Sequence, residues 1–421
     1  MTMQLDIDPH VDSIVMPENL KVGLIVSEAK KKCAEQNRIC DYAGFALGQS
    51  PFPVPGPLEK ALASNADKGH YSVADGIPEL RKAIANFMKR HFGVHVTPSR
   101  VVVGPGTKSL IFTVFTMING HVIIPSPSWI GYTPQIKLLG KHFHILYTRP
   151  EHNYRIQPQD LEDLLVRLAL ENKQHLLVLN NPHNPTGIVY SREELIEIVE
   201  VCRRNNAFIL ADEIYALSTY RFEEFTSLAS LFPEGAFVLN GLSKDRSAGG
   251  YRLGACILPQ YHSKKLKLDF MKIAATVYTN VSTPTQYAAV AAYEPNEEIE
   301  EYFRITRDIH RIMGQFSSDQ VNNMDGIRAT VPQGAFYLFA DFNRLAKDLK
   351  RKNIMTSNQL ETSLMAHPHH VATITGDSLL LRPDDYGARL AFVDYDGKAA
   401  YERYKMNPPK SPAEEREFVR E

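Results

Sequence analysis

The sequence predicts an α/β protein: a large domain with a mostly parallel sheet between helices, followed by a smaller α+β domain. Between residues 101 and 258, short apolar segments such as HLLVLN (175–180) alternate with amphipathic segments such as REELIEIVEVCRRN (192–205). Strands that are apolar on both faces and separated by helices are typical of a parallel sheet covered on both sides. After about Thr285 the pattern changes to one long polar helix, 297–322, and shorter strands, which predicts the second domain.

The individual elements follow from this alternation. In the large domain we expect strands at 101–104, 121–127, 142–148, 175–180, 207–213, 236–242 and 251–258. We expect helices there at 107–118, 129–139, 161–172 and 192–205. In the smaller domain we expect strands within 329–342, 370–376 and 388–394, and a charged helix at the end of the chain. Breaker-rich segments at 51–57 and 406–412 indicate links. We therefore divide the chain into an N-terminal arm with part of the small domain (1–50), a large domain (51–290) and a small C-terminal domain (291–421).

Composition and charge exclude several classes of protein. The 421 residues include 47 Lys and Arg against 48 Asp and Glu, a net charge of −1, whereas nucleic-acid binders and polybasic membrane-surface proteins usually have a basic excess. The acidic N-terminus lacks a signal-peptide pattern, and the longest apolar stretch, near 110–118, is too short to cross a bilayer. The four cysteines, without a CxxC pair, are Cys33, Cys40, Cys202 and Cys256. We expect reduced thiols, no metal site and a cytoplasmic protein.

Five loops at strand ends carry residues suited to ligand chemistry, and such loops are where α/β sheets bind ligands. In GPGTKSL (104–110), Gly106 allows close backbone approach and Thr107 lies at free helix N–H groups, which suits a phosphate. In NNPHNPTG (180–187), two Asn-Pro steps keep the chain extended and direct the Asn184 side chain. In ADEIY (211–215), Asp212 ends an apolar strand and needs a polar partner, and Tyr215 follows it closely.

The other two loops supply basic groups. Lys244 in LNGLSKDRSAGGYRLG (239–254) follows a strand and can form an imine, and Arg252 in the same segment can hold a phosphate in bidentate fashion. Arg389 heads an apolar strand in GARLAF (387–392) and suits a substrate carboxylate. Taken one at a time, these residues have simpler explanations: an ordinary Gly-Pro-Gly turn, a helix-capping aspartate, or solvated surface cations.

Together the loops, in this order, resemble the class I/II aminotransferases of the aspartate aminotransferase superfamily, which are fold-type I pyridoxal-phosphate enzymes. NPHNPTG and the SKxxxxxxxRLG spacing carry the resemblance most strongly, and it runs from about Gly48 to Arg389. It implies a seven-stranded sheet, pyridoxal 5'-phosphate as the cofactor, amino-acid and 2-oxo-acid substrates, and a homodimer with shared active sites. HYSVADGIPELRKAIANF (70–87) resembles the family segment that reaches the neighbouring subunit's site.

Carried over residue by residue, the resemblance implies three catalytic groups, Lys244, Asp212 and Tyr215. Lys244 holds the cofactor as an imine and moves the proton at Cα, Asp212 is the partner of the pyridine nitrogen, and Tyr215 donates with Asn184 to the ring oxygen O3′. The remaining cofactor contacts are Gly106, Thr107, Lys108, the ring-stacking Trp129, Ser243 and Arg252, with Tyr71 and either Thr279 or Asn280 from the other protomer. The implied substrate contacts are Gly48, Asn184 and Arg389.

Three departures from the family pattern affect the details. Gly241 stands where the family often has a phosphate-binding serine, so another group, such as Lys108, has to supply that contact. Ala275 stands where dicarboxylate-specific members carry an arginine. Arg382, in LLLRPDDYGARL, is a rival to Arg389 for the substrate carboxylate.

The resulting functional prediction is an aminotransferase whose donor has a neutral or aromatic side chain. Lys108, Arg246 or Arg382 could instead bind a second carboxylate. A pyridoxal-phosphate-dependent C–S lyase, or a synthase of the aminocyclopropane-carboxylate type, shares the cofactor loops and stays open. A non-catalytic cofactor-binding regulator is a more distant alternative, because no basic helix-turn-helix pattern precedes the first loop.

Overall fold

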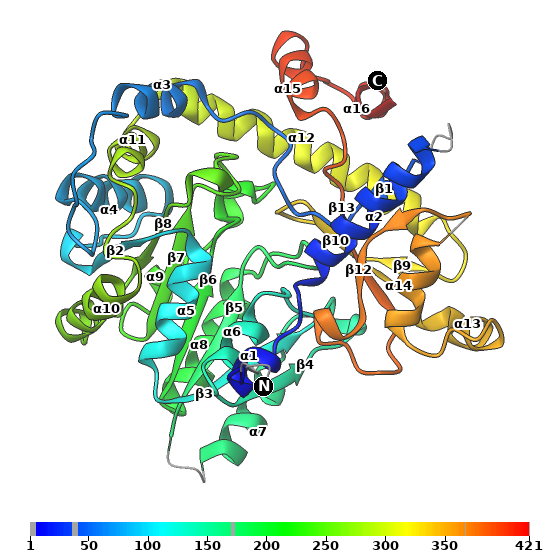
Figure 1. The fold of residues 1–421 in the computed structure, drawn as a ribbon, viewed down its shortest axis with the longest axis horizontal. Coiled ribbons are helices and arrows are strands. Elements are labelled where there is room, and N and C mark those ends of the chain that lie inside the picture. The colour runs from blue at the N-terminus through cyan, green and yellow to red at the C-terminus, as the bar shows by residue number, and fades with distance from the viewer. Residues whose placement is uncertain (1–5, 36–40, 170–172, 367, 421) are drawn as a thin grey trace, which may run out of the picture.

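The computed structural model describes residues 6–35, 41–169, 173–366 and 368–420. It has a large α/β region around a seven-stranded sheet and a smaller α+β region around a four-stranded sheet, and α12 (Glu297–Asn322) runs along the edge of both (Figure 1). The fold class that the sequence predicts is confirmed, and so is the number of strands that the family resemblance implies.

The large sheet has the strand order β2-β8-β7-β6-β5-β3-β4. The strands are β2 (Val101–Gly104), β3 (Gly120–Ser126), β4 (Phe143–Tyr147), β5 (Gln174–Asn180), β6 (Ala207–Asp212), β7 (Ala236–Gly241) and β8 (Gly254–Ile257). Strands β3 to β7 pair in parallel, whereas β8 is antiparallel to both β7 and β2. The parallel pairs bring the ends of β5, β6 and β7 to one edge, where the predicted loops begin.

Helices cover both faces of this sheet because successive strand residues point to opposite sides. In β5, Leu176 packs in one buried cluster and its neighbour Leu177 in another. The first layer consists of α5 (Thr107–Met117), α6 (Tyr132–Leu138) and α10 (Ser263–Val277). The second consists of α7 (Pro158–Leu168), α8 (Arg192–Arg204) and α9 (Leu228–Leu231). A third group, α3 (Gly56–Ser64), α4 (Pro78–Phe92) and α11 (Thr283–Tyr293), packs together beside β2 and β8.

The smaller sheet has the order β12-β13-β10-β9. Its strands are β9 (Arg328–Ala329), β10 (Tyr337–Asp341), β12 (Ile374–Thr375) and β13 (Gly387–Ala391). The prediction of one strand over 370–376 was wrong, because β11 (Val371–Ala372) pairs with β1 (Ala43–Gly44) and only β12 joins the four-stranded sheet. The remaining helices of this region are α13 (Ala346–Arg351), α14 (Ser357–Met365), α15 (Gly397–Met406) and α16 (Pro412–Arg420).

The two ends of the chain pack on this framework. Of the N-terminal helices α1 (Pro9–Asp12) and α2 (Glu18–Glu35), α2 lies across the smaller region (Figure 1). Its Val22 is buried with Ile130 and Ile374, which come from the two different regions. The bounds predicted for α12 are confirmed, but the helix is not polar all round: Ile305, Ile309 and Ile312 lie on a buried face.

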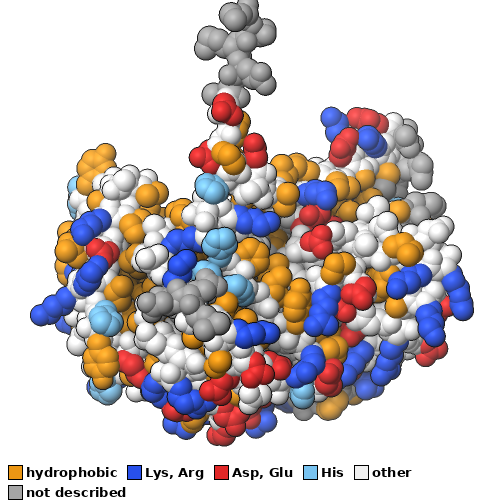
Figure 2. Space-filling model, turned by 90° about the horizontal axis from the view of Figure 1, so that it is seen from below, with side chains coloured by type: hydrophobic (Ala, Val, Ile, Leu, Met, Phe, Trp, Pro, Cys, Tyr) orange, Lys and Arg blue, Asp and Glu red, His pale blue; other side chains and the backbone are white. Residues whose placement is uncertain are grey.

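The surface agrees with the balanced charge. On the face seen in Figure 2, Lys and Arg side chains lie among Asp and Glu side chains. None of the helices in the described residues combines the length and the apolar character needed to span a membrane. Cys33, Cys202 and Cys256 are free thiols, and Cys40 lies outside the described residues.

Candidate active site

The candidate site forms where β5, β6 and β7 end. Asn180 and Asp212 are the last residues of adjacent strands, and their Cα atoms are paired in the sheet register. The Asn180 side chain donates to the Asp212 carbonyl (2.7 Å) and accepts from the Asn184 amide (2.7 Å). These bonds fold the 180–187 loop back over the end of β6, so Asn184 and Asp212 lie in one site.

Asp212 is buried and has one supported carboxylate oxygen. Tyr132, at the start of α6, donates its hydroxyl to Oδ2 at 2.7 Å. Among the described residues no group hydrogen-bonds to Oδ1, although that atom is inaccessible to solvent. Burial raises the pKa of Asp212, and the Tyr132 hydroxyl and the Ile214 amide oppose that rise. An uncompensated buried acceptor of this kind is a place for a donor from a bound group.

Tyr132 also positions the predicted stacking ring. The Trp129 and Tyr132 rings meet edge to face, with centroids 4.9 Å apart. Trp129 is partly buried, and the Lys108 ammonium lies 5.4 Å from the centroid of its ring. The structure therefore places Trp129, Tyr132 and Asp212 in one connected group.

Three hydroxyl and amide groups form a second connected group. The Tyr215 hydroxyl lies 2.9 Å from the Tyr337 hydroxyl of β10, and Asn184 Nδ2 lies 3.5 Å from the Tyr215 oxygen. Tyr337 in turn reaches the Gly48 carbonyl at 3.5 Å. A Cβ atom on Gly48 would lie 2.0 Å from the Tyr337 oxygen, so the close approach requires glycine there.

Lys244 extends into the same space from the loop after β7. Its Nζ donates to the Gly48 carbonyl at 2.6 Å and lies 5.7 Å from the ring centroids of both Tyr215 and Phe336. Burial, and then the positive charge of Arg389, lower the pKa of Lys244 to about 8, against the attraction of Asp212. An amine with this pKa exchanges protons close to neutral pH.

Arg389 and its rival Arg382 lie in different surroundings. Arg389 is 2% exposed, donates from one terminal nitrogen to Asn184 Oδ1 (3.4 Å) and contacts the Ala46 carbonyl with the other. Its Nε is buried and makes no hydrogen bond to a described residue. Arg382 is exposed and stacks 4.6 Å from the Tyr147 ring centroid. The structure brings Arg389, and not Arg382, to Asn184.

Arg246 is also remote from these groups. It is fully buried, pairs with Asp245 at 2.9 Å, and lies 4.6 to 5.0 Å from the ring centroids of Phe87, Tyr293 and Phe303. Ala275 is an exposed residue of α10.

A turn with cationic neighbours lies at the N-terminus of α5. Gly106 caps the helix with φ of +83°, and a Cβ atom there would lie 2.4 Å from a terminal nitrogen of Arg252. Arg252 is held by the Gly249 carbonyl at 2.7 Å. Desolvation and then Arg252 lower the pKa of Lys108. Free N–H groups of a helix start beside two cations are suited to an anion.

The other predicted cofactor contacts fall into two groups, those in the loops of this chain's own site and those expected to serve the other protomer. Thr107 is the first residue of α5, and Ser243 directly precedes Lys244 and is partly buried. At Gly241 a Cβ atom would lie 3.1 Å from the Leu253 carbonyl, so a serine would be tightly packed there. Tyr71 is 85% exposed, and Thr279 is exposed as well; Asn280 bonds within its own turn.

Sequence reasoning missed two residues of the site, Tyr132 and Tyr337. Tyr132 follows Trp129 by three residues within a stretch that the sequence predicts to be helical, and that spacing could have indicated a shared face. Tyr337 lies in an apolar strand of the smaller region, and only the contact between the two regions brings it to Tyr215. No group of three metal-binding side chains is found in the part of the chain that the structure describes.

The structure thus defines an α/β protein with a partly buried amine, a buried carboxylate and a buried guanidinium around one site. It is similar to the aspartate aminotransferase from Thermus thermophilus solved with maleate, with a TM-score of 0.81 and 23% identity over 96% of this chain and 100% of that one. This likeness shows the fold.

The sequence comparisons show the family. Residues 43–389 match the family model described as aminotransferase class I and II. An aspartate aminotransferase of Bacillus subtilis is 31% identical over 75% of this chain and 79% of its own length. A probable aspartate/prephenate aminotransferase of Aquifex aeolicus is 30% identical over 73% and 78%. The chain belongs to the class I and II aminotransferase family.

Proposed function

We propose that this chain uses pyridoxal 5'-phosphate to move an amino group between an amino acid and a 2-oxo acid. The observation that carries the proposal is the combination of Lys244, with its lowered pKa, and Asp212, whose buried Oδ1 lacks a partner among the described residues. The groups that the cofactor needs are an amine, an acid for the ring nitrogen, donors to the ring oxygen and an anion site. Lys244, Asp212, Asn184 with Tyr215, and Gly106 with Arg252 fit these four requirements.

Each side chain has a distinct task in this proposal. Pyridoxal phosphate, when bound, supplies a ring that accepts the electron pair released at the substrate Cα. Asp212 Oδ1 holds the proton on the ring nitrogen, and this charge-assisted bond contributes roughly 1.5–3 kcal/mol. Lys244 Nζ would take the proton from Cα as general base and deliver it, as general acid, to the cofactor carbon bonded to the amino nitrogen. Trp129 orients the ring plane, and Arg252 with the α5 N-terminus fixes the phosphate.

Arg389 would bind the substrate carboxylate. Its two terminal nitrogens, which contact Asn184 and Ala46, form a planar fork suited to a bidentate pair, and its buried Nε has no hydrogen bond to a described residue. Burial lowers the pKa of Arg389, yet a guanidinium remains charged. A carboxylate would therefore compensate a buried charge, which makes binding of the acid group specific.

The proposal includes a donor with a neutral or aromatic side chain. Ala275 offers no cation at the expected position, Arg246 is enclosed by aromatic rings, and Arg382 is exposed at Tyr147. The competing candidate is an acidic donor. Lys108, which lies over the Trp129 ring, would then bind the second carboxylate, and the names of the relatives favour this candidate.

One experiment tests the reaction and the donor together. The protein reconstituted with pyridoxal phosphate is given aspartate, glutamate, phenylalanine, methionine and alanine, and kcat/KM is measured for each with a 2-oxo acid acceptor. A keto acid and an aminated acceptor are expected. Pyruvate with ammonia would indicate a lyase, and a bound cofactor without turnover would indicate a regulator. A clear preference for aspartate would refute the neutral donor, and loss of that preference in Lys108→Met would assign it to Lys108.

We also propose a cytoplasmic homodimer whose sites are shared. The exposed Tyr71 lies between two residues that α11 holds in place: Thr283 donates to the His70 carbonyl (2.7 Å) and Gln286 donates to the Ser72 hydroxyl (2.8 Å). A side chain that projects from an anchored backbone is suited to contact a second copy of the chain.

A further inference from the structure

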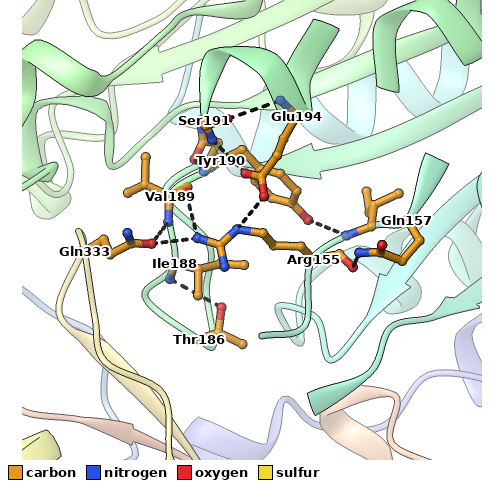
Figure 3. Close-up of polar contacts among 11 residues, drawn as sticks. Arg155, Gln157, Thr186, Ile188, Val189, Tyr190, Ser191, Glu194 and Gln333 are labelled. Carbon is orange, nitrogen blue, oxygen red and sulfur yellow. Dashed lines mark hydrogen bonds and ion pairs between the residues drawn. The ribbon is translucent and has the colours of Figure 1, made fainter. Parts of the chain in front are cut away.

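The loop that carries Asn184 is attached to the smaller region through a set of hydrogen bonds, and Figure 3 shows those that Gln333 accepts. The amides of Gln333 and Gly334 both donate to the Gly187 carbonyl, at 2.7 and 3.1 Å. Gly187 has φ of +70°, and a Cβ atom on it would lie 2.3 Å from the Tyr337 carbonyl. The loop and the segment before β10 are therefore in direct backbone contact.

Side chains complete this attachment. Gln333 Oε1 accepts from the Val189 amide (3.1 Å) and from Arg155 (2.9 Å), as Figure 3 shows. Arg155 also donates to the Val189 carbonyl (3.1 Å) and pairs with Glu194 (3.2 Å). Glu194 belongs to the capping box of α8, a helix that packs on the large sheet. The loop is therefore held between the large region and Gln333 of the smaller region.

A buried hydroxyl makes the second attachment. Thr330 is 7% exposed, donates to the Thr186 carbonyl at 2.7 Å and accepts from the Phe339 amide at 2.9 Å. It thus joins the loop to β10. Both partners lie two residues from a site group, Thr186 from Asn184 and Phe339 from Tyr337.

Residues 330–335, the segment that carries both attachments, also contact the chain that follows Tyr215. The Ala335 amide donates to the Ser218 carbonyl at 3.1 Å, and the Tyr220 amide donates to the Gln333 carbonyl at 2.9 Å. Three separate segments supply the site groups Asn184, Tyr215 and Tyr337. Each group lies three residues from one of these backbone contacts: Asn184 from Gly187, Tyr215 from Ser218, and Tyr337 from Gly334. The distances among the three side chains consequently depend on residues 330–335.

We propose that Thr330 and Gln333 are positioning residues that set the Asn184–Tyr215–Tyr337 side of the site. The inference rests on the proposed function, in which Asn184 and Tyr215 donate to the ring oxygen of the cofactor. Donors held at hydrogen-bonding distance stabilise the negative form of that oxygen, and a looser loop weakens them. Neither residue contacts the site itself.

The test uses the visible absorption of the protein loaded with pyridoxal phosphate and without substrate. The absorption is titrated with pH, and the pH at which the visible band is half converted, its midpoint, is measured for wild type, Thr330→Val and Gln333→Leu. Both variants should raise this midpoint by about 0.5 pH unit or more. Weaker hydrogen bonds to the ring oxygen stabilise its negative charge less, so the bound cofactor keeps its proton up to a higher pH. Gln333→Glu keeps an acceptor for Val189 and Arg155 and should retain the wild-type midpoint.

Matched controls separate positioning from stability. Thr306→Val removes another buried hydroxyl, one that bonds only within α12, and Gln320→Leu removes an exposed amide of the same helix. Both should leave the midpoint unchanged. If Thr330→Val does not fold, the exposed Gln333 still allows the test. Midpoints equal to wild type in Gln333→Leu and in folded Thr330→Val would overturn the positioning role. The absence of any visible band in wild type would instead contradict the proposed function.

Discussion

The Tyr132 hydroxyl donates a 2.7 Å hydrogen bond to Oδ2 of Asp212, while Oδ1 of the same carboxylate has no hydrogen-bond partner among the described residues. One oxygen is thus held by the protein, and in the proposed function the other accepts from the ring nitrogen of the cofactor. Tyr132 thus orients the acid and, together with the Ile214 amide, opposes the rise of the pKa of Asp212.

Removal of the Tyr132 hydroxyl should therefore make Asp212 harder to ionise. In Tyr132→Phe the pKa of Asp212 rises further, so the acid limb of the pH profile of kcat/KM should move to higher pH. The loss of a bond to a charged group, about 1.5 kcal/mol, predicts a fall in kcat/KM of roughly 10-fold at neutral pH. Tyr404→Phe, which removes a hydroxyl bonded to Asp308 between α15 and α12, is the control and should retain the wild-type profile.

The partly buried amine of Lys244 should make the stability of the protein without cofactor depend on pH. The pKa of Lys244 is about 8 in the folded chain and 10.5 ordinarily, so between these values the unfolded chain binds more protons and folding becomes more favourable as pH rises. Below pH 8 the charged amine costs up to about 3 kcal/mol. Lys244→Met should thus be more stable than wild type at pH 7, with a difference that shrinks towards pH 10.

Urea unfolding at pH 7, 8.5 and 9.5 measures this difference. Lys264→Met, at an exposed position of α10, should show no such trend. In the loaded protein, Lys244→Met should also abolish turnover and borohydride fixation of the cofactor. A borohydride-stable adduct that persists in Lys244→Met would place the cofactor on another lysine.

The carboxylate site can be assigned by comparing two arginines. Arg389→Lys keeps the charge but loses the planar fork, and loss of a buried charge-assisted pair typically costs about 2–5 kcal/mol. We expect kcat/KM to fall by roughly 30-fold or more. Arg382→Lys, at the exposed rival position, should change kcat/KM less than about 3-fold. The reverse order of the two effects would assign the carboxylate to Arg382.

The turn at α5 predicts an effect on cofactor affinity. Gly106→Ala places a methyl group 2.4 Å from an Arg252 nitrogen and must displace that side chain. Gly93→Ala is the matched control, because Gly93 also has positive φ, +65°, but has open space around it. The single tryptophan of the chain, Trp129, allows binding to be followed by fluorescence. We expect cofactor binding at least about 10-fold weaker in Gly106→Ala than in Gly93→Ala.

The shared site can be tested by mixing inactive subunits. If Tyr71 serves the neighbouring protomer, a hybrid of Tyr71→Ala and Lys244→Ala subunits contains one intact site, and mixing should recover part of the activity. Size-exclusion chromatography with tagged subunits establishes that hybrids form. Hybrids without any recovery would show that Tyr71 does not act across an interface.

Much of the fold could be predicted because hydrophobic periodicity is local. The strands from β2 to β7 and the helix α12 follow directly from runs and spacings of apolar residues. The antiparallel β8 and the division of 370–376 between two sheets could not be predicted, since pairing partners are chosen by contacts far apart in the sequence.

The same distinction holds for the candidate site. The order of Asn184, Asp212, Lys244 and Arg389 along the chain is a property of the sequence, and it was enough to indicate the family and the chemistry of each residue. The contacts of Tyr132 with Asp212 and of Tyr337 with Tyr215 arise only when the folded chain brings the start of α6 and the strand β10 to the end of β6. The sequence by itself determined which chemical groups are present and on which loops. Tertiary structure alone decided which of them are buried together, because desolvation and hydrogen bonding depend on neighbours that the chain order does not specify.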